Sequence, residues 1–114
     1  MKDFWKWNEK KVTLNGLPQA PHFREREVWY CHLGANVGFE QDGVGGDFLR
    51  PVIFFRKFNN QIFWGVPLTR TEKKTLFYFS FELNGARSTA ILSQNRLIDG
   101  RRLSHKIRCV RGEF

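Results

Sequence analysis

The sequence has few cysteines, and they do not form a metal-binding motif. Cys31 and Cys109 are the only two among 114 residues, and neither belongs to a Cys-x-x-Cys pair or to a Cys/His cluster. This spacing argues against a structural zinc site. A single disulfide between them and two reduced, buried thiols remain as alternatives, and the second suits a cytosolic protein better.

Long hydrophobic runs are also absent. The longest, residues 52–55 and 62–66, fall far short of the roughly 20 apolar residues that a membrane helix needs. Charges at Lys2, Asp3 and Lys6 interrupt the N-terminal segment, so no signal peptide is expected there. These absences predict a cytoplasmic protein with no membrane partner.

Several common catalytic signatures are missing. The sequence lacks the Gly-x-x-x-x-Gly-Lys-Ser/Thr phosphate loop, and its length is too short for a (β/α) barrel of about 250 residues. His22, His32 and His105 are dispersed and show no metal-ligand spacing, so no metal or cofactor is expected. Cys31 and His32 are neighbours on an expected strand, where adjacent side chains point to opposite faces and cannot pair. The length fits one domain, residues 1–114.

What the chain has in excess is positive charge. It carries 19 Lys and Arg against 11 Asp and Glu, a formal net charge of +8. Residues 48–74 hold six basic residues and one acidic, and residues 86–114 hold seven and two. Such an excess favours a polyanionic partner, nucleic acid before an acidic membrane. The two segments form one basic face if the fold brings them together; otherwise the charge only keeps the domain soluble.

The N-terminal segment predicts a helix over residues 3–14. Asp3 suits the N-cap position, and Asn15-Gly16 is a stop signal. Phe4, Trp7 and either Val12 or Leu14 are expected to face the body of the domain. Residues 17–23 contain two prolines and are predicted to be a linker.

The rest of the chain predicts antiparallel strands with tight turns and little helix. Strands are expected at residues 26–33, 51–58, 61–66, 76–83, 88–93 and 107–110. Asn59-Asn60 and Asn84-Gly85 predict two-residue hairpin turns, and Pro67 is expected to end its strand. The pattern indicates five or six strands in a small, strongly curved sheet or barrel, with a short helical turn within residues 100–106.

Residues 34–46 contain five glycines, a density that neither a helix nor a strand tolerates. They predict a long, mobile loop, and long loops in compact domains are usually functional.

Arginine, threonine and acidic side chains can cleave RNA without a metal ion. The substrate supplies the nucleophile, its own 2′-OH, so the protein must stabilise the pentacoordinate phosphorane and move protons. The planar fork of an arginine suits the first task because it grips two phosphate oxygens, and a threonine hydroxyl can hydrogen-bond the same group.

Four short motifs follow one another along the chain. Gly-Ala-Asn-Val-Gly-Phe-Glu-Gln-Asp-Gly occupies residues 34–43, after the first expected strand, and Arg-Pro-Val occupies 50–52. Val-Pro-Leu-Thr occupies 66–69, and Ser-Gln-Asn-Arg-Leu-Ile-Asp occupies 93–99. In this order and on these strands, they resemble the PemK/MazF family of type II toxin–antitoxin endoribonucleases.

The resemblance covers about residues 25–110 and leaves residues 1–24 as an extension with a helix and a linker. It implies a small SH3-like β-barrel, dimeric and related in shape to the CcdB gyrase poisons. It implies metal-independent cleavage of single-stranded RNA at short sequences, which inhibits translation and growth. It also implies a cognate antitoxin whose acidic, flexible segment covers the RNA site, with DNA contacted only through the antitoxin complex.

Site residues follow from the same resemblance, position by position. Arg50 matches the catalytic arginine of the Arg-Pro-Val motif, Thr69 matches the catalytic threonine after Pro-Leu, and Glu40 matches an acid that helps with proton transfer. Gln94 and Arg96 match the Gln-x-Arg of the family, near the RNA groove. The other residues expected to bind RNA are Gln41, Arg70 and Lys73. The loop before Arg50 is longer than in the family, by residues 44–49, so Asp42 and Asp47 remain alternatives to Glu40 as the acid that faces the phosphate.

Structural roles for these residues stay open at this point. Arg50 could cap its strand or pair with a carboxylate, and Arg96 could pair with Asp99 across a bend. Thr69 could be an ordinary turn residue, and Lys73 a solvated one. Two other functions are alternatives: a CcdB-like DNA gyrase poison and a non-catalytic, basic RNA-binding barrel.

Overall fold

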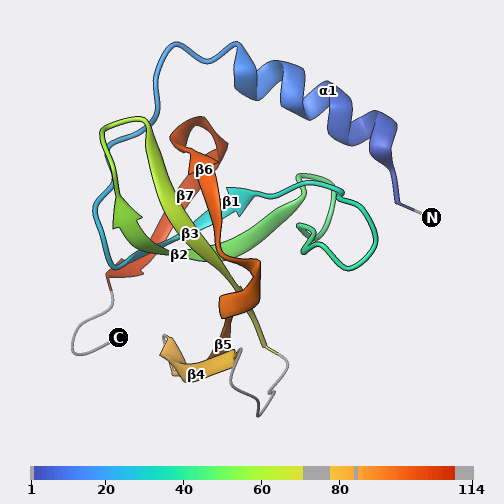
Figure 1. Cartoon of the computed structure of the whole chain (residues 1–114). Coiled ribbons are helices and arrows are strands. Elements are labelled where there is room, and N and C mark those ends of the chain that lie inside the picture. The colour runs from blue at the N-terminus through green and yellow to red at the C-terminus, as the bar shows by residue number, and fades with distance from the viewer. Residues whose placement is uncertain (1, 71–77, 84, 110–114) are drawn as a thin grey trace.

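The computed structural model describes residues 2–70, 78–83 and 85–109, and this part of the chain is mainly β with one N-terminal helix, as predicted (Figure 1). The elements in chain order are α1 (Phe4–Asn15), β1 (Glu27–His32), β2 (Leu49–Lys57), β3 (Ile62–Thr69), β4 (Tyr78–Leu83), β5 (Ala86–Ile91), the 3-10 turn η1 (Leu92–Gln94), β6 (Arg96–Asp99), the 3-10 turn η2 (Gly100–Arg102) and β7 (Leu103–Cys109). In these ranges α1 is the longest helix, and it lacks the length and apolar composition to cross a bilayer.

All the strands pair in antiparallel fashion in the order β4-β5-β3-β2-β1-β7, with β6 also on β3. Within the described residues no ladder joins β4 to β7, so the sheet is open and the expected closed barrel is not formed. The cause lies in β3, because β6 occupies its edge at residues 62–65 and β5 reaches only Leu68 and Thr69. The β4–β5 hairpin is therefore attached to one end of β3 and lies below the rest of the sheet in Figure 1.

A break separates β5 from β6 along that edge of β3. Between its residues paired with β6 and those paired with β5, β3 has Val66 and Pro67, whereas the opposite segment has residues 91–95. Pro67 has no N–H to offer a neighbouring strand, and the extra residues form the turn η1. Since β3 continues to Thr69, the prediction that Pro67 ends the strand is wrong.

The N-terminal helix begins and ends where its capping residues predict. Asp3 Oδ1 accepts a hydrogen bond from the backbone N–H of Lys6 at 2.9 Å, which satisfies a free donor of the first turn. Gly16 follows the last turn, and its N–H bonds to carbonyls of that turn.

Only one side of α1 packs on the domain. Trp7 and Leu14 are buried, and they lie two turns apart on the same face. Phe4 and Val12 are 50% and 68% exposed, so the expectation that Phe4 packs inward is wrong and Leu14, not Val12, is the buried alternative. The ring of Trp7 rests against Phe48, with ring centroids 5.4 Å apart.

The central strand β2 is buried on both faces. Val52 and Phe54 belong to one hydrophobic cluster and Ile53 to another, as successive side chains of a strand must. Phe54 packs on Phe63 with ring centroids 4.0 Å apart, and Phe23 meets Phe54 edge-on at 5.3 Å. Cover on both sides thus explains residues 52–54 of this apolar run, whereas Phe55 at its end is 57% exposed.

Both predicted hairpins are present, with different turns. Leu83 of β4 pairs with Ala86 of β5, and Gly85 between them has a φ of +78°, whereas Asn84 lies outside the described residues. In the β2–β3 turn the side-chain oxygen of Asn59 accepts from the N–H groups of Gln61 and Ile62, at 2.8 and 3.0 Å, and the turn is longer than predicted. The helical turn expected within 100–106 ends at Arg102, where β7 follows.

The two cysteines differ in environment and form no disulfide. Cys31 is buried, whereas Cys109 is exposed, so the expectation of two buried thiols is wrong for Cys109. Burial raises the pKa of the Cys31 thiol to about 12, although nearby arginines oppose the shift. This thiol is therefore protonated at neutral pH and unsuited to act as a nucleophile. The neighbouring His32 points elsewhere, with Nδ1 2.7 Å from the carbonyl oxygen of Asp47.

A buried carboxylate, Glu27, organises the start of β1. Its Oε1 accepts from the backbone N–H of Arg24 at 2.7 Å and from Trp29 Nε1 at 3.2 Å, and its Oε2 pairs with Lys106 Nζ at 2.8 Å. Burial raises the pKa of Glu27, but the hydrogen bonds from Lys106, Arg24 and Trp29 outweigh it and hold the pKa below its ordinary value.

Glu27 should therefore make stability depend on pH. A carboxylate whose pKa is lowered by folding stabilises the fold above its unfolded pKa of about 4.3 and loses this effect as the pH falls through its folded value. We expect Glu27→Gln to lower the free energy of unfolding by about 1–3 kcal/mol at pH 7 and by less at about pH 3. Urea unfolding at both pH values measures this, with Glu9→Gln on the exposed face of α1 as control. Equal losses at the two pH values would contradict the assignment.

Candidate functional site

Two of the four motifs meet at one end of the β2–β3 hairpin. Val52 and Pro67 form the last pair of this ladder, and Arg50 and Thr69 each lie two residues beyond it on their strands. Arg50 Nη1 donates to the backbone carbonyl of Leu68 at 3.1 Å, so the guanidinium reaches the residue beside Thr69. Hairpin pairing thus brings together the two residues that the sequence predicts to be catalytic.

The guanidinium of Arg50 is half-buried and held by acceptors from the glycine-rich loop as well. Its Nε donates to the carbonyl oxygen of Asp42 at 2.5 Å. With its carboxamide oxygen turned toward the guanidinium, Gln41 accepts from Arg50 Nε and Nη2 at 3.1 and 2.9 Å. Burial lowers the pKa of Arg50 below its ordinary value, and the charge of Asp42 opposes this shift only in part. An arginine stays protonated at neutral pH, so this side chain would act by its charge.

Arg50 and Thr69 line a cavity of about 480 Å³, which we call the arginine cavity. Arg70, a predicted RNA-binding residue, lines it as well, together with Tyr30 and Ser88. Its remaining lining is largely apolar. Lys73, the other predicted contact in this region, lies outside the described residues.

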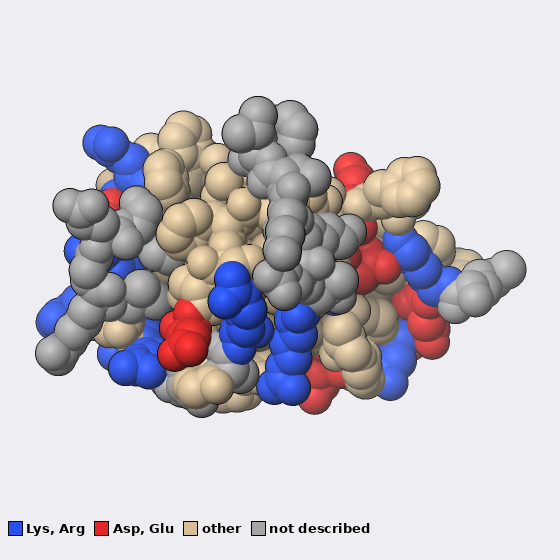
Figure 2. Space-filling view, turned by 90° about the horizontal axis from the view of Figure 1, so that it is seen from below, with Lys and Arg blue, Asp and Glu red and all other residues tan. Residues whose placement is uncertain are grey.

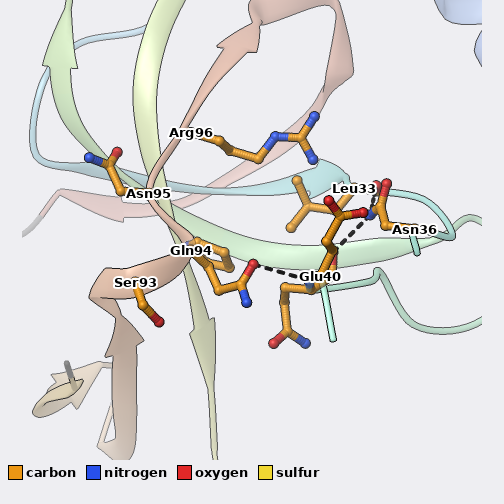
Figure 3. Close-up of a pocket in the computed structure, with 9 residues that line it drawn as sticks. Leu33, Asn36, Glu40, Ser93, Gln94, Asn95 and Arg96 are labelled. Atoms are coloured by element: carbon orange, nitrogen blue, oxygen red, sulfur yellow. Dashed lines mark hydrogen bonds between the residues drawn. The ribbon is translucent and has the colours of Figure 1, made fainter. Parts of the chain in front are cut away.

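The other predicted site residues line a second, smaller cavity of about 260 Å³, which we call the polar cavity. Its polar lining residues are Asn36, Glu40, Gln41, Ser93, Gln94, Asn95 and Arg96. Figure 3 shows Arg96 of β6 extending over this hollow toward the loop that carries Asn36 and Glu40. Gln41 lines the polar cavity and also bonds Arg50, so the two cavities are neighbours.

Gln94 ties the turn η1 to the glycine-rich loop. Its Oε1 accepts from the backbone N–H of Gln41 at 3.2 Å (Figure 3). Its Nε2 donates to the carbonyl of Phe39 at 3.1 Å. The break between β5 and β6 places Gln94 where it can make both bonds. One half-buried side chain thereby fixes the position of the loop against the sheet.

The three acidic candidates have different surroundings. Asp42 is engaged twice: Oδ1 accepts from the backbone N–H of Asn36 at 2.7 Å, and Oδ2 pairs with Lys2 at 3.0 Å. Asp47 is 69% exposed and lies 3.7 Å from Lys10. Glu40 lines the polar cavity, and its Oε1 accepts from the backbone of its own turn. Of the three, Glu40 alone lines the polar cavity.

The glycine-rich loop is held by packing, hydrogen bonds and the N-terminal helix. A Cβ on Gly34 would lie 2.0 Å from the ring of Trp7, and one on Gly43 would lie 1.7 Å from the carbonyl oxygen of Phe48. The extra piece at residues 44–49 is closed by a β-bridge between its first and last residues. Gly34 and Gly43 therefore allow close packing that a side chain would prevent. The loop that was expected to be mobile is packed against Trp7 of α1.

Lys2 completes this attachment. Its Nζ donates to the carbonyls of Asn36 and Gly38 at 2.7 and 3.0 Å, besides its ion pair with Asp42. The backbone carbonyl of Asp42 also accepts from Arg50. Asp42 therefore connects Lys2, in the segment before α1, to the guanidinium of Arg50. The N-terminal extension thus supports the loop that holds Arg50.

Many basic residues of the two positive segments have structural partners. Arg101 pairs with Asp99 at 2.9 Å and Lys106 with Glu27 at 2.8 Å. The hydrogen bonds from Arg101 hold the pKa of Asp99 below its ordinary value. Asp99 therefore pairs with Arg101, and the alternative that it pairs with Arg96 is wrong.

The positive charge is distributed over more than one surface. Figure 2 shows Lys and Arg side chains at several places on the face seen from below, with Asp and Glu side chains among them. Of the residues in the two basic segments, Arg50 and Arg70 line the arginine cavity and Arg96 lines the polar cavity. Three of the ten basic residues that the structure describes in these segments therefore line the two cavities.

Three polar residues of the polar cavity were not singled out from the sequence. Asn36, Ser93 and Asn95 line the polar cavity, and the carboxamide of Asn36 donates to the carbonyls of Leu33 and Gln41 at 3.0 and 2.8 Å. Their place within the first and last motifs was the only available signal. In the described residues, no three His, Cys, Asp or Glu side chains come together as metal ligands would.

Comparison of the sequence with protein-family models and with curated proteins identifies no relative. No family model matches the chain, and no curated protein is similar enough in sequence to be recognised as related.

Proposed function

We propose that this chain is an endoribonuclease toxin of the PemK/MazF kind, which cleaves single-stranded RNA without a metal ion. The observation that carries the proposal is the meeting of Arg50 and Thr69 at the arginine cavity. Gln41 links this cavity to the polar cavity, where Glu40 and Arg96 lie. Residues from all four motifs therefore surround two neighbouring hollows.

In the proposed reaction the 2′-oxygen forms a bond to the adjacent phosphorus while the bond from phosphorus to the 5′-oxygen breaks. The products are a cyclic phosphate and a 5′-hydroxyl. Arg50 offsets the charge on the pentacoordinate phosphorane, and Thr69 donates a hydrogen bond to one of its oxygens. Glu40 accepts the proton of the 2′-OH and returns a proton to the leaving 5′-oxygen.

The same proposal covers fold, partners and location. The open, curved sheet is a variant of the small SH3-like barrel, and the active form is a cytoplasmic homodimer. A cognate antitoxin covers both cavities with an acidic segment, which the positive charges of Arg50, Arg70 and Arg96 in their lining favour. Contact with DNA occurs only through the complex with the antitoxin.

The test is to incubate the purified protein with a long single-stranded transcript in EDTA. We expect discrete fragments that carry cyclic phosphate and 5′-hydroxyl ends, because the substrate supplies its own nucleophile. The matched control is the same sequence with 2′-O-methyl sugars, which lacks that nucleophile and should stay intact. Intact transcript would refute the nuclease proposal. If the protein then binds RNA in a salt-sensitive way without forming products, a non-catalytic RNA-binding domain is favoured. If it instead stalls gyrase–DNA complexes, a gyrase poison is favoured.

A further inference from the structure

Phe39 is the most exposed large hydrophobic side chain in the described residues. Its side chain is 100% exposed, and its neighbour Val37 is 76% exposed. An aromatic ring in full contact with water forgoes the free energy that burial would supply. A ring in this position is available to an external partner.

The backbone beneath this ring is held in place. Gly38 has a φ of +54°, and the N–H of Glu40 bonds to the carbonyl of Val37 at 3.0 Å, which closes a tight turn around Phe39. Glu40 Oε1 accepts from the N–H of Val37 at 2.9 Å, and Gln94 Nε2 donates to the carbonyl of Phe39 at 3.1 Å. The ring is thus presented on a turn that is bonded to the sheet.

The surroundings of the turn suit a nucleobase. Glu40 and Gln41, which follow Phe39, and Gln94, which bonds its carbonyl, all line the polar cavity (Figure 3). Ser93 and Asn95 line the same cavity, and hydroxyl and amide groups of this kind read the edge of an unpaired base. Arg96 lines it as well and adds a positive charge for the backbone. An exposed aromatic ring on a turn whose next two residues line such a cavity is a combination by which proteins bind single-stranded nucleic acid.

We propose that Phe39 stacks on a base of single-stranded RNA at the rim of the polar cavity. This inference rests on the proposed function, since it names how that site holds its substrate. Phe39 takes no part in the chemistry and touches no phosphate. It contributes binding that is equal in the ground state and the transition state.

The experiment compares Phe39→Ala and Phe39→Trp with the unaltered protein on the transcript used above. Uniform binding affects KM and leaves kcat unchanged. We expect Phe39→Ala to raise KM by about 5- to 100-fold, as the loss of one stacked base does, and Phe39→Trp to restore it. The matched control is Phe55→Ala, because Phe55 is a 57% exposed phenylalanine on β2. It should leave KM unchanged.

A binding measurement separates this inference from the proposed function. The probes are fluorescent 2′-O-methyl oligo(A) and oligo(U), each carrying one 2-aminopurine. The unaltered protein should quench 2-aminopurine and Phe39→Ala should not, whereas the salt dependence of binding should be the same for both. Failure of the unaltered protein to cleave RNA overturns only the proposed function if quenching still depends on Phe39. If KM and quenching are unchanged in Phe39→Ala, the stacking inference is overturned. The exposed ring would then bind a different partner, such as another protein.

Discussion

Replacing Arg50 with alanine should lower the rate of RNA cleavage by about 10²- to 10³-fold, the usual effect of removing one charge-stabilising donor from a transition state. The guanidinium lies beside Thr69 in the arginine cavity and is half-buried, so water replaces its charge poorly. We expect the loss in kcat more than in KM, because the phosphorane carries more negative charge than the bound phosphodiester. Single-turnover cleavage of the transcript measures this rate.

Two further variants make the result specific. Arg50→Lys keeps the charge but loses the planar fork that bonds Leu68, Asp42 and Gln41, so it should recover only part of the rate. Arg56→Ala removes an exposed arginine from the same strand and should cleave at the normal rate. Thermal unfolding of each variant checks that the fold persists. Full activity in Arg50→Ala, with the fold intact, would remove Arg50 from the mechanism.

Replacing Phe23 with alanine should lower the free energy of unfolding by about 3–5 kcal/mol, the range found for buried aromatic residues. Phe23 is 1% exposed and packs against Phe54 and Phe63 at centroid distances of 5.3 and 5.1 Å. Lys57 lies 4.8 Å above its ring. Domains of this size have a total stability of about 5–15 kcal/mol, so this one substitution removes a large fraction of it.

Urea unfolding at pH 7 is the measurement, with the midpoint and slope fitted separately. Phe55→Ala again supplies the control, because its more exposed side chain should change stability by less than about 1 kcal/mol. A loss in Phe23→Ala no larger than in Phe55→Ala would show that the segment before β1 is dispensable for the core.

Phe23 also illustrates a limit of the sequence pattern. Two prolines in residues 17–23 correctly predict a segment outside helix and strand. Nothing in the local pattern says that such a segment buries its last side chain in the core. That burial depends on the rings of Phe54 and Phe63, which come from strands much later in the chain.

Pro67 illustrates a second limit. Proline within a strand predicts a strand end, because it cannot donate to a ladder. In the structure the ladder on one side of β3 is interrupted at Val66 and Pro67, while Pro67 still pairs with Val52 on the other side. Whether proline ends a strand or only breaks one of its ladders depends on its neighbours, which local sequence does not specify.

The candidate site likewise combines features that local sequence predicts with features that it does not predict. The motifs identify Arg50 and Thr69 by residue type, and the hairpin signal at Asn59-Asn60 already implies that the two segments flanking it pair. By contrast, the bond from Gln94 to the carbonyl of Phe39 joins residues that lie far apart in the sequence. No spacing rule predicts it, since it depends on how η1 emerges from the break between β5 and β6.

The sequence by itself determined the mainly β class, the helix with its Asp3 cap, the positions of both hairpins and the motifs that contribute the candidate site. These features depend on residues close together in the chain, where backbone preference and side-chain periodicity decide. Only the tertiary structure decided that the described sheet is open, that α1 and Lys2 hold the glycine-rich loop, and that Phe39 stands exposed beside a polar cavity. Those features depend on packing and hydrogen bonds between distant segments, whose free energy exists only in the assembled fold.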